Sequence, residues 1–344
     1  MKNRWLTQIN QNRERYRQLC AKEPSMCIFL KDYWQDAVCQ NDQWSAVLYE
    51  KGGNIMGSLV FCYQVRSRGI SISQPIQTQT NGVWIKPFTG KNEYKRLEYE
   101  KEVFTGLITE LEKLPLINYS QTFTVEITNW LPFYWKGFRQ STRYTYRIPD
   151  ISDPEAAIAG FSSGKRGNLN HALRSGLTVK YDLPAEEFYA NHEMTLKKQG
   201  KTISYPYETL KKIVNTVYAH DCGRTIYAVD AQNQIHAALL IIWDANCGFY
   251  LINTVDPDFR DSGAAALLVA QTLRFLADKG VRQFDFEGSM IEGVEKSYRQ
   301  FGTKQMPYFA ISKEYYGSPL IWVYEKAESL LRKCVQRGRR AFGK

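Results

Sequence analysis

Residues 253–265 read Asn-Thr-Val-Asp-Pro-Asp-Phe-Arg-Asp-Ser-Gly-Ala-Ala, and this stretch is the strongest indication of the fold. A run of β-branched and aromatic residues, 248–255, ends there at a turn. An Arg-x-x-Gly-x-Ala element then leads into an apolar helix. The first turn of a helix has unpaired N–H groups and the positive end of the helix dipole, and small residues let an anion approach the backbone. The stretch therefore predicts a phosphate-binding junction between a strand and a helix.

The size and composition of the chain indicate a folded protein with anionic partners. Its 344 residues are enough for two domains of ordinary size. The formal charge, 45 − 35 = +10, favours nucleotides, phosphates, nucleic acid or anionic lipid headgroups as partners. The aromatic content of 14% argues against disorder.

The cysteines and histidines indicate neither a disulfide framework nor a metal site. The seven cysteines are an odd number without any Cys-x-x-Cys pair, which fits a reducing compartment. The four histidines form no ligand pattern with them, so we expect no metal. The N-terminus lacks the apolar segment of a signal peptide, and the longest nearly unbroken apolar run, 237–243, is too short to span a bilayer. These features predict a cytoplasmic protein.

The order of predicted elements occurs twice along the chain. In the first half, strands at 44–50, 55–65 and 70–73 are separated by turns at 51–54 and 66–69 and form an antiparallel meander. A helix at 93–114 follows, then strands at 121–127 and 139–148. The second half repeats this order with strands at 224–229, 234–243 and 248–255, a helix at 262–278, and strands at 283–287 and 305–312.

Turn-forming residues at 149–154 separate the two halves, so we predict a boundary near residue 150. The second half is predicted to begin with three helices, at about 154–175, 184–200 and 205–220, and an amphipathic helix at about 319–335 closes the chain. An α/β unit used twice is the architecture that this order predicts.

The second half resembles the GNAT acyltransferase superfamily. That family's cofactor loop consists of Arg or Gln, two residues, Gly, one residue, and Gly or Ala, and Arg260, Gly263 and Ala265 match it. A Tyr four residues before a Gly often follows the fifth strand of the family, as Tyr298 and Gly302 do here.

The doubled layout resembles the tandem branch of that superfamily. This branch holds the Fem-type peptidoglycan-bridge ligases and a group of bacterial acyl-CoA-type acetyltransferases. Residues 284–289, Phe-Asp-Phe-Glu-Gly-Ser, and the basic helix start at 163–168 resemble the second domain of this branch. The resemblance implies an α/β fold of two tandem GNAT-like domains, each a mostly antiparallel twisted sheet flanked by helices. Residues 1–150 would be a degenerate domain, and residues 151–344 the domain with the cofactor site.

The resemblance implies acetyl-CoA or another acyl-CoA as the donor. In the family, the strand ending at Val255 separates from the strand at 284–287, and the pantetheine arm bonds to main chain in the gap. The residues implied for the cofactor are Asn253, Thr254 and Val255 along the strand, and Arg260, Ser262, Gly263, Ala264 and Ala265 at the helix start. A solvated loop cation is the alternative for Arg260. The first half lacks a counterpart of this loop, so we predict a single cofactor site.

Acyl transfer from a thioester to an amine requires a base for the amine and an acid for the thiolate. The resemblance implies Tyr298 as the acid, with simple aromatic packing as the alternative. Glu287 is the best candidate for the base, followed by Asp285, because strand alternation places both acids on one face. The alternative is that the two acids are structural and form an ion pair with Lys296, Arg299 or Arg282.

Three further groups are candidates for substrate binding. Lys165 and Arg166 lie at the start of the second half and are expected to hold a phosphate of the donor or the acceptor. Trp135, within the aromatic segment 130–138, is a candidate for lining the acceptor groove, although clustered aromatics more often form a core. The helix at 319–335 and its basic tail predict either docking on the fold, contact with an anionic membrane, or RNA binding.

The sequence thus favours an acyl-CoA-dependent N-acyltransferase that acts on an amine of a cell-envelope or polysaccharide precursor, without DNA as a partner. The first alternative is a Fem-like ligase that transfers an aminoacyl group from tRNA. No long helical insertion appears between residues 150 and 220, which separates the chain from many of those ligases. The second alternative is a non-catalytic binding protein on the same fold.

Overall fold

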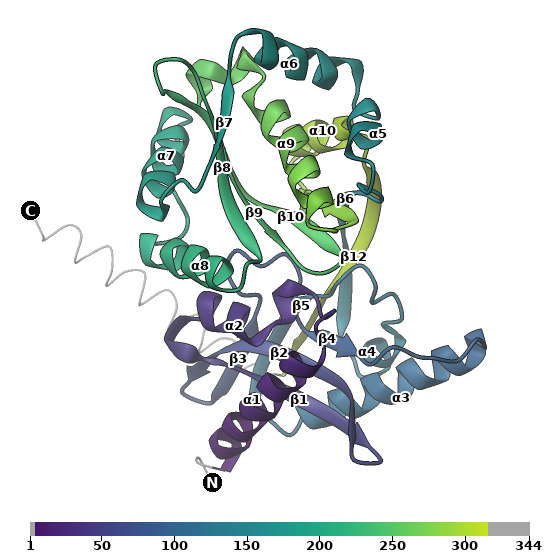
Figure 1. Cartoon of the computed structure of the whole chain (residues 1–344). Helices are drawn as coiled ribbons and strands as arrows, with labels where there is room; N and C mark the ends of the chain where they lie inside the picture. Colours follow the sequence, from purple (N-terminus) through teal and green to yellow (C-terminus); the bar gives the residue numbers. More distant parts are fainter. Residues whose placement is uncertain (1–3, 316–344) are drawn as a thin grey trace, which may run out of the picture.

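The structure is a computed structural model that describes residues 4–315. Within these residues a single sheet of 12 strands has the spatial order β1-β2-β3-β5-β12-β6-β11-β10-β9-β8-β7, with β4 beside β2. Figure 1 shows the second half of the chain above and the first half below, joined through this sheet. The mixed α/β fold with a large, mostly antiparallel sheet flanked by helices is the one that the sequence predicted.

The strands of the first half are β1 (Trp44–Lys51), β2 (Asn54–Arg66), β3 (Gly69–Ser73), β4 (Val83–Ile85), β5 (Leu116–Thr122) and β6 (Arg139–Ile148). Those of the second half are β7 (Thr178–Tyr181), β8 (Gly223–Val229), β9 (Ile235–Trp243), β10 (Cys247–Val255), β11 (Gln283–Asp285) and β12 (Lys304–Glu314). The helices are α1 (Arg4–Lys22), α2 (Asp32–Val38), α3 (Glu93–Leu111), α4 (Leu131–Trp135), α5 (Pro154–Ala159), α6 (Ser163–Arg174), α7 (Ala185–Lys198), α8 (Tyr207–Ala219), α9 (Ala264–Asp278) and α10 (Glu292–Tyr298).

The two predicted meanders are confirmed. Strands β1, β2 and β3 pair antiparallel in sequence order, and so do β8, β9 and β10. The tight turn between β1 and β2 depends on Gly52 and Gly53, whose φ angles of 59° and 76° suit glycine. After each meander a helix crosses over and returns the chain in a parallel strand, so that β5 pairs with β3 and β11 pairs with β10.

The last strand of each half lies within the half-sheet of the other. β12, the last strand of the second half, pairs antiparallel with β5 of the first half, and β6 pairs antiparallel with both β12 and β11. In Figure 1 β12 runs from the upper half down into the lower one. The chain order therefore divides near residue 150, whereas the sheet is continuous across that division.

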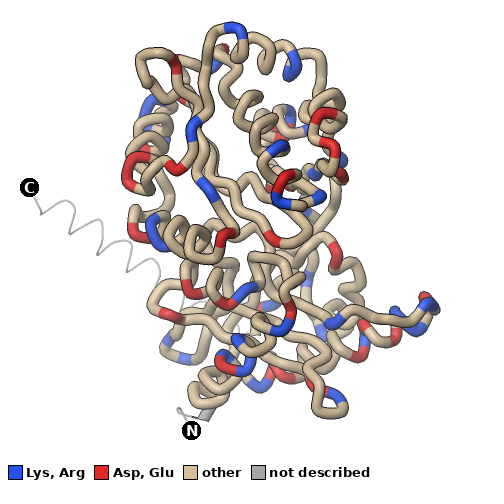
Figure 2. The backbone as a smooth tube through the Cα atoms, in the orientation of Figure 1, with Lys and Arg blue, Asp and Glu red and all other residues tan. Residues whose placement is uncertain are grey.

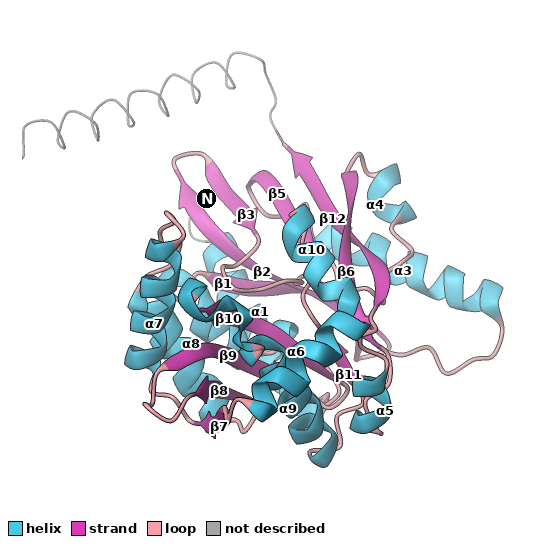
Figure 3. Cartoon of the chain, turned by 90° about the horizontal axis from the view of Figure 1, so that it is seen from above, coloured by secondary structure: helices cyan, strands magenta, loops and turns pink. Residues whose placement is uncertain are grey.

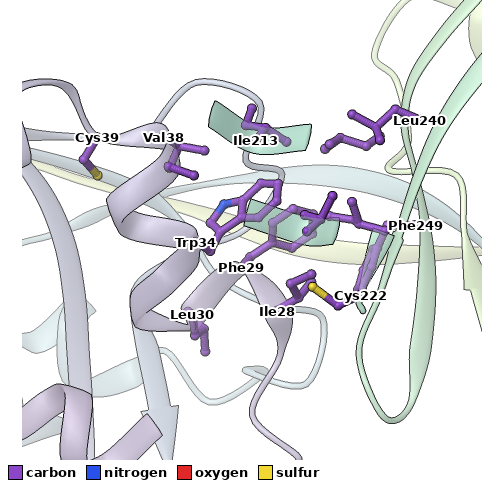
Figure 4. Close-up of a cluster of buried hydrophobic side chains, with 14 of the residues drawn as sticks. Ile28, Phe29, Leu30, Trp34, Val38, Cys39, Ile213, Cys222, Leu240 and Phe249 are labelled. Atoms are coloured by element: carbon purple, nitrogen blue, oxygen red, sulfur yellow. The ribbon is translucent and has the colours of Figure 1, made fainter. Parts of the chain in front are cut away.

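The hydrophobic core also crosses between the halves. Phe29, which precedes α2, packs edge-on against Phe249 of β10 with ring centroids 4.8 Å apart. Trp34 of α2 and Ile213 of α8 belong to the same buried cluster, which Figure 4 shows in close-up. A second cluster lies beneath α9 on the opposite face of β8–β10, and a third lies between α3 and the first-half strands. Figure 3 shows the helices on both faces of the sheet.

Three differences between predicted and observed elements have a visible cause in the structure. The strand expected at 121–127 is β5, Leu116–Thr122, because its register follows its neighbours β3 and β12. The helix expected at 154–175 is interrupted, and Ser162 donates its backbone N–H to the carbonyl of Gln300 at that interruption. β11 ends at Asp285, two residues earlier than predicted, because Glu287 adopts a left-handed φ of 60°.

Charged residues of both signs are spread over the helices and loops of both halves (Figure 2). No helix among residues 4–315 is both long and apolar enough to cross a bilayer. The amphipathic helix expected at 319–335, and the contacts predicted for it, lie outside the described residues.

Candidate active site

The N-terminus of α9 keeps backbone N–H groups without a partner. Ala264 donates its N–H to Ser262 Oγ at 3.3 Å, but the N–H groups of Ala265 and Ala266 have no hydrogen-bond partner among the described residues. The first turn contains no acidic side chain. Unpaired amides and the helix dipole together favour an anion at such an end.

The surroundings of this helix end leave one cation free and neutralise two acids. Arg260 is exposed and forms no ion pair with a described residue. Asp256 and Asp258 both accept from Lys198 Nζ, at 2.7 and 2.5 Å. Arg260 therefore adds positive charge beside these amides, and the adjacent Asp261, which also forms no ion pair with a described residue, opposes it.

Gly263 is required by packing, which differs from the reason predicted for it. Its φ is 79°, and a Cβ there would lie 2.0 Å from the backbone oxygen of Asn168 on α6. Glycine therefore allows α6 to contact the start of α9, in addition to any close approach of a ligand. A bulky residue at this position would therefore displace α6.

The edge of β10 next to α9 is unpaired over much of its length. β10 pairs with β11 only at Cys247, Gly248 and Phe249, whereas its pairing with β9 continues to Val255. β11 ends at Asp285, the partner of Phe249, so residues 250–255 of β10, which include Asn253, Thr254 and Val255, have no strand partner on this side. An unpaired strand edge presents free main-chain donors and acceptors to an extended ligand.

Tyr298, at the end of α10, lies beside this unpaired segment of β10. Its ring packs at 5.9 Å from Tyr250 of β10 and at 5.1 Å from Phe286, which follows β11. The hydroxyl forms no hydrogen bond with a described residue. Burial, with a smaller contribution from Glu287, raises the pKa of Tyr298, so the hydroxyl stays protonated at neutral pH and can donate a proton.

Glu287 presents an unsatisfied carboxylate oxygen next to Tyr298. Its Oε1 is buried without a hydrogen-bond partner among the described residues. Burial, and then the charge of Asp285, raise the pKa of Glu287 well above its usual range. Its φ of 60° is uncommon for a residue with a side chain, and such conformations are frequent at functional sites. Glu287 thus has the properties of a proton acceptor.

Asp285 is held in an ion pair that joins the two halves. Arg147 of β6 donates from Nε to Asp285 Oδ2 at 3.0 Å, and Thr145 donates to Oδ1. The partner is therefore Arg147 and none of the three cations suggested by the sequence. Asp285 also accepts from the backbone N–H of Glu287 at 2.7 Å, so it positions Glu287. Burial raises the pKa of Asp285, and the neighbouring Arg147 opposes that rise.

Lys165 and Arg166 have different environments at the start of α6. Lys165 Nζ donates to Ser297 Oγ at 2.9 Å, directly beside Tyr298, and lies 4.3 Å from the centre of the Phe301 ring. Burial lowers the pKa of Lys165. Arg166 donates to the backbone carbonyls of Ala159 and Phe161, at the end of α5. Lys165 therefore borders the candidate site, whereas Arg166 is engaged in closing a helix end.

Residues 165–298 match the model of the acetyltransferase (GNAT) domain family. This segment, 134 of the 344 residues, contains the uncapped start of α9, the unpaired segment of β10 and Tyr298. The match supports an acyltransferase.

Solved structures show the same fold over most of the chain. FemX is 11% identical, with 86% of this chain and 95% of that chain covered and a TM-score of 0.66. A conserved protein of unknown function from Bacteroides thetaiotaomicron is 10% identical, with 86% and 96% covered and a TM-score of 0.56. A tandem GNAT protein from the clavulanic acid biosynthesis pathway is 11% identical, with 80% and 84% covered and a TM-score of 0.50. No curated protein matches the chain.

The aromatic segment of the first half lies apart from the GNAT site. Phe133 and Phe138 are buried in the first-half core. Trp135 is 60% exposed on α4, with Lys101 Nζ 5.8 Å from its ring centre. These two phenylalanines are therefore core residues, the alternative given above for clustered aromatics. Among the described residues no cluster of His, Cys, Asp and Glu could hold a metal.

Sequence reasoning missed a polar cavity of about 630 Å³ beside β10. His192 of α7 and Tyr205, in the loop before α8, line it, and His192 Nδ1 lies 2.7 Å from Tyr205 Oη. Nothing in the sequence near His192 forms a known motif. A signal was available in the polar loop 199–206, since loops carry many functional residues.

Proposed function

We propose that the protein is an acyl-CoA-dependent N-acyltransferase that acts in the cytoplasm on an amine of a cell-envelope or polysaccharide precursor. The observation that carries this proposal is the uncapped start of α9 beside the unpaired edge of β10. An acyl-CoA would place its diphosphate at the free amides of Ala265 and Ala266, near Arg260. Its pantetheine arm would extend along residues 250–255 and leave the thioester near Tyr298.

The residues around the thioester provide the two proton transfers that the reaction needs. The amine nitrogen attacks the thioester carbonyl carbon, a C–N bond forms, and the C–S bond breaks. Tyr298 Oη gives its proton to the departing sulfur, and a base removes a proton from the attacking nitrogen. Glu287 is a base candidate on the Tyr298 side of β10, supported by its raised pKa and its unpartnered Oε1.

Calorimetric titration of the full chain with CoA, acetyl-CoA and longer acyl-CoAs tests the proposal. We expect one molecule bound per chain, because the first half has no comparable helix end. Release of free CoA thiol in the presence of an amine panel then reports transfer. Absence of both binding heat and a thermal shift with every acyl-CoA would overturn the proposal.

A Fem-like ligase that uses aminoacyl-tRNA is the second candidate. The fold similarity to FemX, with a TM-score of 0.66, and the net charge of +10 favour it. The open helix end favours a diphosphate-bearing donor instead. Salt-sensitive binding of aminoacylated tRNA, together with no binding of acyl-CoA, would promote this second candidate.

A further inference from the structure

The cavity of about 630 Å³ lies on the α7 and α8 face of the sheet, opposite α9. It is bounded by the loop between these helices, by Gln77 of the first half, and by the far end of β10. Leu251 and Ile252 both belong to the core cluster on this face, whereas Tyr250 belongs to the cluster under α9. A register shift in β10 between Tyr250 and Ile252 accounts for two successive residues on one face.

The cavity meets the segment of β10 that is unpaired on its β11 side. Leu251, Ile252 and Asn253 line the cavity, and all three lie beyond the last residue that pairs with β11. A thioester placed along this segment can therefore be approached from the cavity, while the diphosphate end of the donor remains at α9. The cavity is thus positioned for an acceptor rather than for the donor.

His192 is oriented in this cavity by Tyr205. The hydrogen bond of 2.7 Å engages Nδ1, and Tyr189 Oη donates to the backbone carbonyl of Tyr205 at 3.0 Å. Nε2 has no hydrogen-bond partner among the described residues. Burial lowers the pKa of His192 and raises that of Tyr205, so both groups are neutral at physiological pH. In the tautomer whose Nδ1–H donates to Tyr205 Oη, Nε2 carries a free lone pair.

The lining of the cavity indicates the chemistry of the acceptor. No Asp or Glu is among its described lining residues, so it offers no carboxylate to a polycation. The polar side chains are mostly neutral and suit hydroxyl groups, namely Gln77, Thr202, Ser204 and Asn253. Lys201 is the one lysine or arginine among these described residues. Such a lining favours a hydroxyl-rich amine of low positive charge.

We propose that this cavity binds an amino sugar as the acceptor and that His192 Nε2, which lines the cavity, removes the proton from its attacking amine in place of Glu287, which does not. The proposal rests on the acyl-CoA-dependent function proposed above. The amine nitrogen forms a bond to the acyl carbon, its proton passes to Nε2, and the thiolate leaves with the proton of Tyr298. His192 and Tyr298 then exchange their protons with solvent, which restores both groups.

Thiol release with acetyl-CoA and glucosamine, galactosamine or spermidine tests the acceptor class and the base separately. We expect transfer to an amino sugar and little to spermidine. His192→Gln should lower kcat with the amino sugar by about 100-fold, and the affinity for acetyl-CoA should stay within about twofold. Free imidazole should restore part of the rate to His192→Ala, which a purely structural role of His192 would not allow. Gln77→Ala should raise KM for the amino sugar more than it lowers kcat.

The outcomes distinguish this proposal from the function on which it rests. A wild-type protein that binds no acyl-CoA defeats the proposed function itself. Transfer to spermidine but to neither amino sugar overturns the acceptor class, and an unchanged kcat in His192→Gln overturns the base. If none of the three amines reacts, labelling of His192 with diethylpyrocarbonate tests whether the cavity binds an amino sugar. Protection by glucosamine supports the site, and equal labelling with and without glucosamine overturns it.

Discussion

The helices that follow the two meanders begin in opposite ways. At the start of α3, Asn92 Oδ1 accepts from the N–H groups of Tyr94 at 3.0 Å and Lys95 at 3.3 Å, and Glu93 adds a negative charge. At the start of α9, Gly263 precedes three alanines without a side-chain cap beyond Ser262. One architecture therefore occurs twice, with the anion site closed by the chain itself in the first half and open in the second.

The strands beside these helices differ in the same way. In the first half, β3 is five residues long, and Ile70, Ser71 and Ile72 all pair with β5. In the second half, β10 extends six residues beyond its last pair with β11. A closed helix end thus accompanies a paired strand, and an open end accompanies a free strand edge. This difference explains why one donor site per chain is expected.

The largest expected effect comes from the ion pair that joins the halves. Arg147→Met should destabilise the protein by about 3–5 kcal/mol, because it leaves the buried Asp285 carboxylate unpaired. The exposed cation Arg282 is the matched control, and Arg282→Met should change stability by less than about 0.5 kcal/mol. Urea unfolding followed by tryptophan fluorescence measures both. Equal, small effects would mean that Asp285 is not charged in the folded protein.

Tyr298→Phe tests whether the second half alone carries the chemistry. We expect kcat to fall about 100-fold with acetyl-CoA affinity unchanged, because the variant lacks the proton for the leaving thiolate. Tyr134 is the matched control, because its side chain is exposed on α4, before the last strand of the first half. Tyr134→Phe should leave the rate unchanged.

The pH dependence of kcat independently tests Tyr298 as the proton donor. Burial raises the pKa of this phenol, and the proton donor is the protonated form, which predominates below that pKa. The activity lost through deprotonation of Tyr298 should therefore appear only above the usual tyrosine value of about 10. A wild-type rate in Tyr298→Phe would leave this residue a packing role.

Ala265→Glu should convert the open end of α9 into an end like that of α3. The carboxylate interacts favourably with the helix dipole, by about 0.3–1 kcal/mol, so the fold is expected to survive. It also repels a diphosphate, and we expect CoA binding to weaken at least tenfold, or about 1.4 kcal/mol. Ala265→Gln has nearly the same size without the charge and should bind CoA much more tightly than Ala265→Glu. Equal Kd values for the two variants by calorimetry would contradict the site.

The smallest effect is expected from the reverse change in the first half. Asn92→Ala removes the cap of α3 and should cost about 1 kcal/mol of stability, whereas Asn92→Gly should cost only a few tenths. Neither variant should bind a second CoA, since β3 has no unpaired extension. If Asn92→Ala bound two CoA molecules per chain, the Asn92 cap alone would be what prevents CoA binding in the first half.

Local patterns predicted much of this architecture. Turns such as Gly52-Gly53 and the alternation of the strands located both meanders, and the Arg-x-x-Gly-x-Ala element located the start of α9. These features depend on neighbours in sequence. The break between α5 and α6 had a local signal too, because Ser162 caps α6 by accepting from the N–H of Lys165 at 3.3 Å.

Features that depend on distant segments could not be predicted. The exchange of β6 and β12 depends on which strand edges meet, and Arg147 is 138 positions away from its partner Asp285. The register of β5 is likewise fixed by β3 and β12. The same limit applies to the candidate site, because His192 gains its significance only from Tyr205 and from the bulged segment of β10.

The exchanged last strands have a consequence for synthesis on the ribosome. β5 is flanked by β3 on one side and by β12 on the other, and β12 is among the last described segments to be made. When the N-terminal half leaves the ribosome, one edge of β5 is therefore unpaired. It stays exposed until residues 304–314 are synthesised and pair with it. Such an edge is prone to aggregation, so a nascent chain stalled near residue 150 is expected to need a chaperone.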